Sequence, residues 1–455
     1  MQLPRTRNKV DIHKIGLLIL LLITLSVYFF TPTKGTVSMT LFYVCFSLML
    51  ISNYIYFKAK KKSNYLDFDT IFIVVYCLVG FSTTFFYNNY EIYQAIFLGF
   101  PVDEEYINKG NFLFLMGLQS YLLGSLLPVK ISKTKKKSFI IKTNFLIILV
   151  FILIIAFIGF GGINYYRSEY NDAVNNDSGT IVKYTLLLLV TTAMALIGTE
   201  FYNKKLNVNY KISWFAFGAM FFLIGTLLVI GNRTAASQIL LPIICLYAMF
   251  FKNISFKKFL VCILFGIPFM WFFQQLRTGD SEFELTNPIM LILDLTIPMR
   301  NTYAALQYVD VKDFTYGSSM IIDVSGIVPF LPSFVQESYP QLEPGSASLL
   351  TEYTFLNLNT PDEFRIGLGT TIIADIYIAF GVIGVLIFMY ILGRLVNKWL
   401  SKSYQLNYYS IIILCGVLGN AIFMVRGGYF HPLRFIVWAL VIASFNKFLH
   451  RAWKR

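Results

Sequence analysis

Apolar runs long enough to cross a bilayer, roughly 20 residues each, recur along the whole chain and constrain its fold more than any other feature. Hydrophobic residues make up 56% of the 455 residues and charged residues only 14%, which is more apolar surface than a water-soluble core could cover. The runs lack the alternation of polar and apolar residues that marks the strands of a membrane barrel. We therefore expect an all-α polytopic membrane protein, with residues 1–455 forming a single integral membrane domain.

We expect about twelve transmembrane helices, an even number that places both termini on the same side of the membrane. The longest connection, residues 274–369, joins the ninth and tenth spans and is too long and too apolar for a disordered linker. Within it, residues 287–308 predict an amphipathic helix at the membrane surface, and residues 321–334 an apolar stretch broken by glycine and proline. The predicted spans are 15–30, 37–57, 69–87, 111–127, 139–159, 183–200, 212–230, 235–251, 257–273, 370–393, 408–425 and 433–449.

The net charge of +14 follows membrane topology and does not indicate nucleic acid as a partner. The loops and ends that alternate to one side hold 27 of the 38 Lys and Arg, but only 4 of the 24 Asp and Glu. Lysine-rich loops such as 58–62 and 130–137 mark the cytoplasmic side, so both termini are assigned to the cytoplasm. The basic excess also attracts anionic headgroups, which makes membrane lipids an expected partner.

Arginines gather in the acidic loops on the opposite side of the membrane, where lysines are few. Arginine is the side chain that binds phosphate through a planar, bidentate fork. Its placement therefore favours a phosphate-bearing substrate at the outer face of the membrane. The outer arginines are Arg167, Arg233, Arg277, Arg300, Arg365, Arg426 and Arg434.

Three of these arginines lie where a helix begins or ends. Arg233 occupies a very short turn, and Arg277 follows the ninth span directly. Arg365 precedes the tenth span by a few residues and is followed by Gly367 and Gly369, which would let backbone N–H groups approach a phosphate at the start of a helix. Three alternatives stay open: an arginine at this depth can simply extend to the membrane surface, it can pair with a nearby carboxylate, and a glycine pair can simply form a turn.

The connection between the last two predicted spans carries Arg426, Tyr429 and His431, the outer side's one histidine. A histidine suits acid–base chemistry near neutral pH, although a lone one more often makes a structural hydrogen bond. Asp375 lies in the first turns of the tenth span, where an acid needs a partner; we expect one of the arginines. Arg300 and Arg434 are expected as contacts at the surface or with lipid headgroups, and Tyr429 as a contact of the substrate.

The cysteines predict neither a disulfide framework nor a metal site, because all of them fall inside apolar runs. The first apolar run, Ile15–Phe30, lacks a small-residue cleavage site and is expected to be a retained span. The cysteines are Cys45, Cys77, Cys245, Cys262 and Cys415.

Several segments resemble the O-antigen polymerases of the Wzy type. Arg365–Gly384 is similar to the span that follows that family's large periplasmic loop, while Phe314–Ser319 and Ile327–Pro332 are similar to motifs within the loop. The family often has an arginine after the first proline of the second motif; this chain has Phe330 there, so no role transfers to it. The overall layout is also similar across nearly the whole chain.

The resemblance implies a bacterial inner-membrane glycosyltransferase with a fold of the GT-C type, related to O-antigen ligases. Such an enzyme transfers the growing glycan from undecaprenyl pyrophosphate to the next lipid-linked repeat unit at the periplasmic face. Its substrates are undecaprenyl-pyrophosphate-linked oligosaccharides, a chain-length regulator is the expected protein partner, and neither a cofactor nor a metal ion is expected.

On this reading, an acceptor hydroxyl attacks the anomeric carbon and the pyrophosphate lipid leaves, so cationic groups must stabilise its developing charge. We assign that role to Arg233, Arg277, Arg365 and Arg426 as catalytic residues. His431 and Asp375 are the candidate general bases, with Glu352 and Glu363 behind them. The candidate substrate-binding residues are Arg167, Gly367, Gly369, Arg300 and Tyr429.

Two other functions stay open at this point. An O-antigen ligase would use the same chemistry with lipid A–core as its acceptor. A flippase for lipid-linked oligosaccharides would carry its charges along a central cavity, whereas these arginines gather at the outer ends of the spans beside a long loop. That placement favours catalysis at the outer face.

Overall fold

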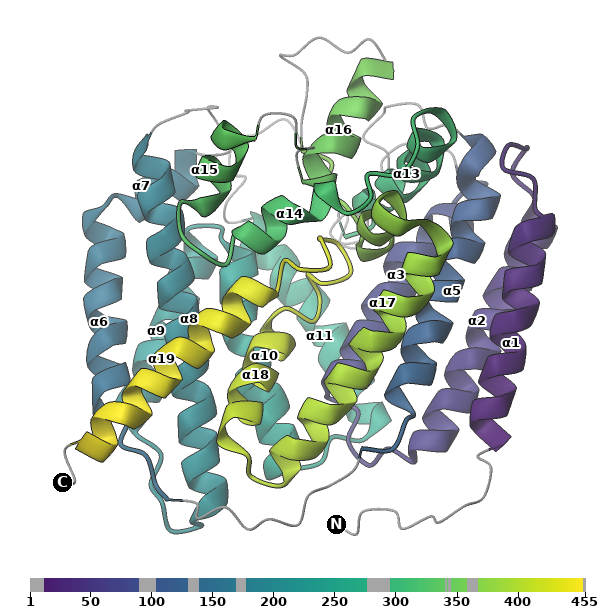
Figure 1. Ribbon diagram of the computed structural model, residues 1–455. Helices are drawn as coiled ribbons and strands as arrows, with labels where there is room; N and C mark the ends of the chain where they lie inside the picture. Colours follow the sequence, from purple (N-terminus) through teal and green to yellow (C-terminus); the bar gives the residue numbers. More distant parts are fainter. Residues whose placement is uncertain are drawn as a thin grey trace.

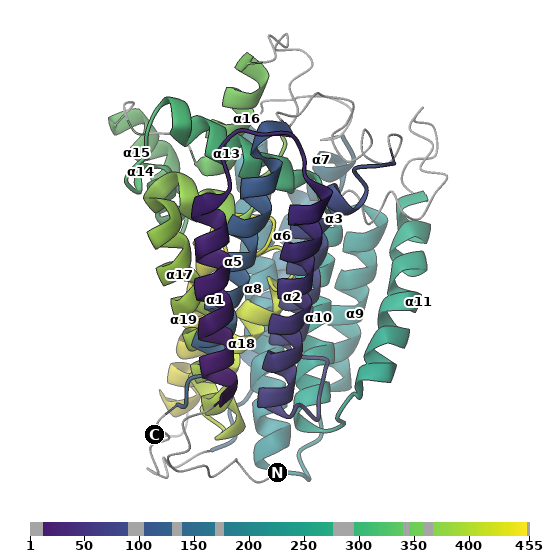
Figure 2. The same ribbon diagram turned by 90° about the vertical axis from the view of Figure 1, so that its right-hand side faces the viewer.

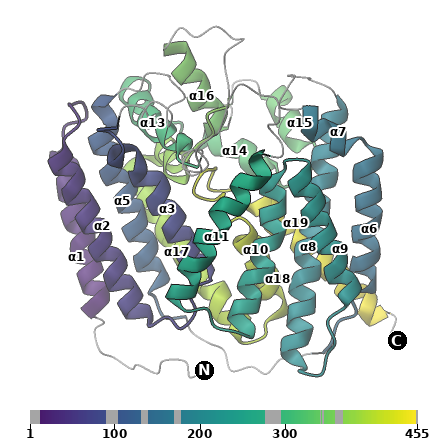
Figure 3. The same cartoon turned by 180° about the vertical axis from the view of Figure 1, so that it is seen from behind.

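In the computed structural model the described chain is helical, and no strand occurs within it. Long helices stand side by side and end at two opposite faces of the bundle, which we name the upper and lower faces after Figure 1. The same layout is seen from the two other directions in Figures 2 and 3. The structure describes residues 12–89, 104–129, 139–168, 177–275, 295–339, 342, 345–357 and 367–452.

Every predicted span overlaps a helix, so the apolar runs located the elements correctly. The long helices of the bundle are α1 (Ile12–Phe30), α2 (Met39–Lys60), α3 (Phe68–Phe85), α5 (Ile107–Ser125), α6 (Asn144–Gly159), α8 (Asp177–Leu206), α9 (Trp214–Val229), α10 (Arg233–Phe250), α11 (Phe256–Gln275), α17 (Ile372–Tyr404), α18 (Tyr408–Gly419) and α19 (Leu433–Ala452).

Seven of these helices are long and apolar enough to cross a membrane, namely α1, α2, α3, α8, α10, α17 and α19. Three more, α6, α9 and α18, are apolar but shorter. The protein is therefore a polytopic, all-helical membrane protein. The number of helices that cross the bilayer and the side to which each end points remain predictions.

Local chemistry explains where many of these helices begin. An oxygen-bearing side chain just before the helix accepts a hydrogen bond from one of the first backbone N–H groups, which would otherwise lack a partner, and such a cap contributes about 1 kcal/mol. The residues that cap α2, α3, α9, α10, α17 and α18 in this way are Ser38, Asp67, Ser213, Asn232, Thr371 and Asn407.

Basic residues gather where helices reach the lower face. Lysines occupy the last turn of α2, of α8 and of α17, and α19 ends with His450 and Arg451. Positive charge is favourable at a helix C-terminus because the unpaired carbonyl groups there carry partial negative charge. Helix α1 begins at the same face at which α19 ends (Figure 1). This arrangement agrees with the prediction that the lysine-rich loops share one side of the membrane.

Helices α5 and α17 pack closely against each other. A β-carbon added at Gly124 of α5 would lie 2.1 Å from the carbonyl oxygen of Tyr390, and one at Gly393 of α17 would lie 2.1 Å from that of Tyr121. Between membrane helices, glycine lets the two backbones approach where a larger side chain would hold them apart. These two glycines therefore allow α17 to pack closely against α5.

A buried carboxylate ties the lower ends of α2, α3 and α5 together. Asp69 accepts hydrogen bonds from the hydroxyls of Tyr56 at 2.7 Å and Tyr121 at 2.5 Å, and Lys62 lies 3.6 Å from it. A buried charge is costly unless it is paired and hydrogen-bonded. Because Asp69 has both kinds of partner, it acts as a structural anchor.

Short helices cover the upper face (Figure 1). The predicted surface helix, residues 287–308, lies partly outside the described residues; within them, α13 begins at Arg300 and its first turns are buried against the bundle. The stretch 321–334 is broken as expected, because one helix ends at Ser325 and the next begins at Leu331. These upper helices are η2 (Ile297–Met299), α13 (Arg300–Val311), α14 (Ser318–Ser325), α15 (Leu331–Ser338) and α16 (Ser346–Asn357); η1 (Glu104–Tyr106) and α7 (Gly162–Ser168) lie before them in sequence.

Two helices depart from the predicted continuous spans. Helix α17 is broken at Gly381, whose φ of 63° and ψ of −157° are not helical. Helix α18 ends at Gly419, although the predicted span runs to residue 425. Residues 420–432, which we call the turn segment, make successive turns before α19 begins. The sequence of the turn segment stays apolar as far as Val425, which is why hydropathy alone extended the span too far.

Candidate functional site

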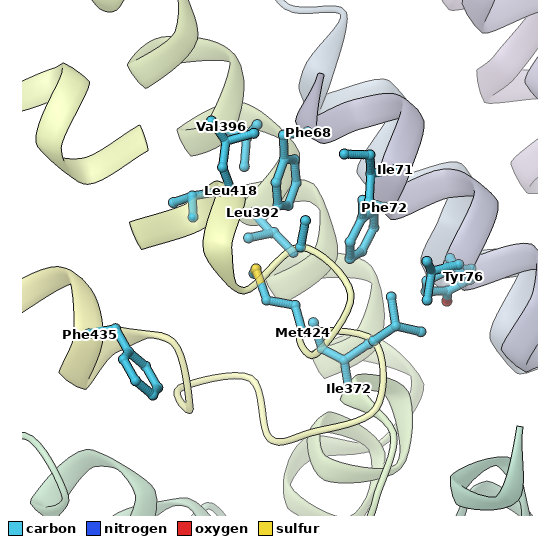
Figure 4. Packing of buried hydrophobic residues seen from close by; sticks show 14 of the residues in the cluster. Phe68, Ile71, Phe72, Tyr76, Ile372, Leu392, Val396, Leu418, Met424 and Phe435 are labelled. Carbon is cyan, nitrogen blue, oxygen red and sulfur yellow. The ribbon is translucent and has the colours of Figure 1, made fainter. Parts of the chain in front are cut away.

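The turn segment is enclosed by protein. It lies beneath α14 and beside the upper end of α17, both in green shades in Figure 1. Its apolar residues face the core: Figure 4 shows Met424 close to Ile372 and Leu392 of α17, with Phe435 of α19 at the other side. Irregular backbone inside a helical membrane protein needs partners for its polar groups, and it persists where it is buried in protein or lines a cavity.

Hydrogen bonds hold the beginning of the turn segment. Asn420 is fully buried, with an exposed fraction of 0%, and its side-chain oxygen accepts a 2.9 Å bond from the Gln238 amide of α10. The same side chain donates to the carbonyl oxygen of Gly416 at 2.8 Å. Further along, the carbonyl oxygen of Val425 accepts from the N–H of Ile372, the first residue of α17, at 3.0 Å. The segment is thus fixed between α10 and α17.

Asp375 holds the middle of the turn segment. The backbone N–H of Tyr429 donates to Asp375 Oδ2 at 2.7 Å. Asp375 is fully buried, and its second oxygen, Oδ1, has no hydrogen-bond partner among the described residues. We expected an arginine beside this acid. The carboxylate of Asp323 in α14 faces it, and an arginine partner stays a prediction, because Arg277 and Arg365 lie outside the described residues.

Gly428 separates the two carboxylates. A β-carbon built at Gly428 would lie 2.1 Å from Asp323 Oδ2 and 3.4 Å from Asp375 Oδ2. A real side chain cannot approach an oxygen as closely as the first distance, so glycine is required for this packing. Asp323 and Asp375 come from helices that are far apart in sequence, and they meet at a single residue of the turn segment.

A cation lies beside Asp323. Arg434, in the first turn of α19, interacts electrostatically with Asp323 and with the hydroxyls of Tyr184 and Tyr166. Its Nη2 atom lies 3.3 Å from His431 Nε2, while its Nε atom is buried without a hydrogen-bond partner among the described residues. We expected Arg434 at the surface. It lies instead between the cap of the bundle and the turn segment.

The surroundings shift the ionisation of two groups in this cluster. Burial raises the pKa of Asp323 above the usual value of a carboxyl, and the positive charge of Arg434 opposes that rise. Burial lowers the pKa of His431 to about 3, and the neighbouring Arg434 adds to the effect. The His431 imidazole is therefore neutral at physiological pH and is a weak proton acceptor.

The upper helices are attached to α19 beside this cluster. The indole N–H of Trp438 donates to the carbonyl oxygen of Ile327 at 2.8 Å, across the turn between α14 and α15. On the other side of that turn, the N–H of Phe330 donates to the Tyr184 hydroxyl of α8 at 2.8 Å. These contacts hold α14, and with it Asp323, over the turn segment.

Of the arginines proposed for catalysis, the structure describes the surroundings of two. Arg426 belongs to the turn segment itself and is half-buried. Arg233 is the first residue of α10, five residues before Gln238, which binds the turn segment. At the rise of an α-helix it stands about 7.5 Å above that contact along the helix axis. Arg277 and Arg365 lie outside the described residues, as does Glu363.

The glycine pair before α17 is less open to an anion than the sequence indicated. Gly369 has a φ of +71° and its carbonyl oxygen accepts from the Asn301 amide, while a β-carbon at Gly367 would meet nothing within 4 Å. The first N–H groups of α17 already have protein partners: that of Ile372 bonds Val425, and that of Ala374 bonds the Thr371 hydroxyl at 3.0 Å. The start of this helix is therefore occupied by the protein itself.

The remaining candidates lie apart from the cluster or have side chains that are not described. Arg300 begins α13 and is buried, with an exposed fraction of 3%, so it is not the surface contact that we expected. Arg167 lies near the end of α7, and its side chain is outside the described part of the structure. Glu352 is exposed on α16. The Tyr429 ring lies in the turn segment, and its hydroxyl donates to the carbonyl oxygen of Phe388 at 3.1 Å.

Asp323 is the residue of the cluster that sequence reasoning missed. It stands alone among apolar residues in the stretch 318–330, the same signal that singled out Asp375. The rule that an acid in an apolar segment marks a functional region would have added Asp323 to the candidates. All five cysteines are free, as the sequence predicted.

The fold and the site define an integral membrane protein that carries a partly buried acid–arginine cluster at one end of a helical bundle, beneath a cap of short helices. A family model, described as O-antigen polysaccharide polymerase Wzy, matches residues 12–446, and the chain belongs to this family. Neither the curated proteins nor the solved structures contain a match to the chain.

Membership in this family supports polymerisation of O-antigen repeat units as the function. The protein is accordingly a polymerising glycosyltransferase, and its substrates are lipid-linked O-antigen repeat units. The family and the membrane-spanning helices together indicate the bacterial inner membrane as its location.

Proposed function

We propose that this polymerase transfers the growing glycan from undecaprenyl pyrophosphate to the next lipid-linked repeat unit at the periplasmic face, without a metal ion. The observation that carries the proposal is the cluster around the turn segment, which gathers Asp323, Asp375, Arg426 and Arg434 at the upper end of the bundle. The upper face is the periplasmic one in this proposal, because the lysine-rich helix ends lie at the lower face. Both termini are then cytoplasmic, with about twelve spans and a fold of the GT-C type.

The leaving group makes arginine the useful side chain here. As the bond between the anomeric carbon and the diphosphate oxygen breaks, negative charge develops on the diphosphate, and fixed cations stabilise it without reorganising. Arg426 and Arg233 take this role among the described residues, and Arg277 and Arg365 remain part of the proposal. Arg167, Arg300, Gly367, Gly369 and Tyr429 remain proposed contacts of the substrate.

The acid Asp375 has a positioning role in this proposal. It is fully buried and its Oδ2 atom is engaged by the turn segment, so it holds the loop that carries Arg426. His431 is a weak base in its surroundings, which leaves it to orient Arg434.

A reconstituted reaction tests the proposed function. Full-length protein in lipid nanodiscs is given undecaprenyl-diphosphate-linked repeat units, extracted from cells from which this gene has been deleted, as the sole substrate. We expect a ladder of polymer on the lipid carrier, and we expect the same ladder in the presence of EDTA. A ligase would make no polymer without lipid A–core, and a metal-dependent enzyme would need a divalent cation to recover.

The same question can be asked in cells. Deletion of the gene should reduce the lipopolysaccharide ladder to core plus one repeat unit, and the wild-type gene should restore the full ladder. Loss of the single repeat as well would contradict polymerisation and favour ligation or lipid flipping. A chain-length regulator, the proposed protein partner, would alter the length distribution of the ladder and leave polymer present.

A further inference from the structure

Glycosyl transfer to a sugar hydroxyl needs a group that accepts the hydroxyl proton, and the cluster limits which group can do this. Asp375 is fully buried and already accepts the Tyr429 N–H. His431 has its pKa lowered to about 3 by burial and lies beside a guanidinium, so it holds a proton poorly. Neither of these groups is suited to take a proton from a substrate that arrives from outside.

Asp323 differs from both in its access. Its side chain is only partly buried, it lies in a helix of the upper cap, and its Oδ2 atom points at the backbone of Gly428. Because Gly428 has no side chain, the carboxylate stands directly over the turn segment that carries Arg426. An acceptor hydroxyl placed against Asp323 would therefore lie beside Gly428, two residues along the turn segment from the arginine that we assign to the leaving diphosphate.

The neighbours of Asp323 determine how well its carboxylate accepts a proton. Asp375 faces it from α17 and Arg434 faces it from α19. Burial disfavours the charged form of Asp323, which strengthens it as a base, whereas Arg434 keeps it ionised. His431 reaches Asp323 only through Arg434. This balance is typical of catalytic carboxylates that work near neutral pH.

We propose that Asp323 is the general base of the polymerisation. The absence of a side chain at Gly428 lets the Asp323 carboxylate lie over the turn segment, and Arg434 balances its charge. The proposal rests on the proposed function. The acceptor O–H bond breaks and its proton goes to an oxygen of Asp323, while the acceptor oxygen forms a bond with the anomeric carbon of the donor. The bond from that carbon to the diphosphate oxygen breaks, and its electron pair leaves with the lipid diphosphate.

The test uses full-length protein in nanodiscs with the lipid-linked repeat units described above. Asp323→Asn removes the proton acceptor and keeps the shape, so we expect the initial rate to fall about 100-fold or more. Binding of the lipid-linked unit and the melting temperature should stay unchanged. Glu337→Gln, which alters an exposed acid of the neighbouring helix α15, is the matched control and should behave as wild type.

A chemical rescue separates a base from a structural residue. In Asp323→Ala, added formate supplies a small carboxylate in the vacated space and should raise the rate about tenfold or more. The proposal is overturned if Asp323→Asn stays within tenfold of wild type, if binding or melting temperature falls together with the rate, or if formate restores nothing. Wild-type protein that makes no polymer would instead overturn the proposed function, and this inference with it.

Discussion

The backbone N–H of Tyr429 donates a hydrogen bond of 2.7 Å to Asp375 Oδ2, across 54 residues of sequence. This bond joins the first turns of α17 to the irregular segment that carries Arg426. In the interior, a backbone donor that loses its partner costs about 1–3 kcal/mol. The geometry of the turn segment therefore depends on one buried carboxylate, and this dependence can be measured.

Asp375→Ala should destabilise the protein and lower polymerisation together, because the Tyr429 N–H is left without an acceptor. Asp375→Asn keeps an oxygen at that position, so it should retain most of the stability and a measurable rate. Melting temperature in detergent and initial polymerisation rate check both variants. An Asn variant that is fully stable and fully inactive would show that Asp375 takes part in the chemistry itself.

Gly428→Ala should reduce polymerisation strongly, because the new methyl group would stand 2.1 Å from Asp323 Oδ2 and must displace it. The expected loss is about tenfold or more in rate, with the protein still inserted in the membrane. Gly225→Ala in α9 is the control, since a β-carbon there meets nothing within 4 Å. Equal rates for the two variants would argue against a functional role for the packing at Gly428.

Arg434→Gln should move the pH dependence of the reaction. Arg434 lowers the pKa of Asp323, so its removal raises that pKa further above the usual carboxyl value. A base must be deprotonated to act, and the acidic limb of the rate profile should therefore shift to higher pH. Rates measured between about pH 5 and pH 8 check this shift. An acidic limb at unchanged pH would show that Arg434 does not affect the pKa of Asp323.

Arg426→Ala and Arg233→Ala should each lower the polymerisation rate by about 100-fold or more if they stabilise the leaving diphosphate. Lysine at either position should restore part of the rate, since it keeps the charge but loses the bidentate fork. Lys312→Ala, an exposed outer-face cation next to α13, is the matched control. Reconstituted protein and membrane levels in cells should be compared, so that poor insertion is not mistaken for lost catalysis.

Gly393→Ala should lower the melting temperature, because its methyl group would stand 2.1 Å from the Tyr121 carbonyl oxygen and push α17 away from α5. Overpacking of this kind costs about 1–3 kcal/mol. Gly218→Ala in α9 meets nothing within 4 Å and should be neutral or slightly stabilising. The comparison shows whether the packing of α17 against α5 depends on glycine at this contact.

The sequence by itself determined the class of fold, the position of each apolar helix and the grouping of lysines at one face. These are local properties, because an apolar run of about 20 residues is long enough to cross the bilayer whatever its neighbours in the fold are. It also singled out Asp375, Arg426 and His431 as candidates, because an ionisable group in apolar surroundings is costly wherever it is placed. The family resemblance seen in residues 314–384 agrees with the family model that matches the chain.

Only the tertiary structure decided which polar groups meet. Hydropathy extended the eleventh predicted span past Gly419, because Ala421–Val425 is as apolar as a helix and its turns are held by contacts from α10 and α17. The approach of the Asp323 carboxylate to Asp375 depends on how α14 folds back over the bundle. Such contacts join segments far apart in sequence, and their energy comes from packing that no local pattern records.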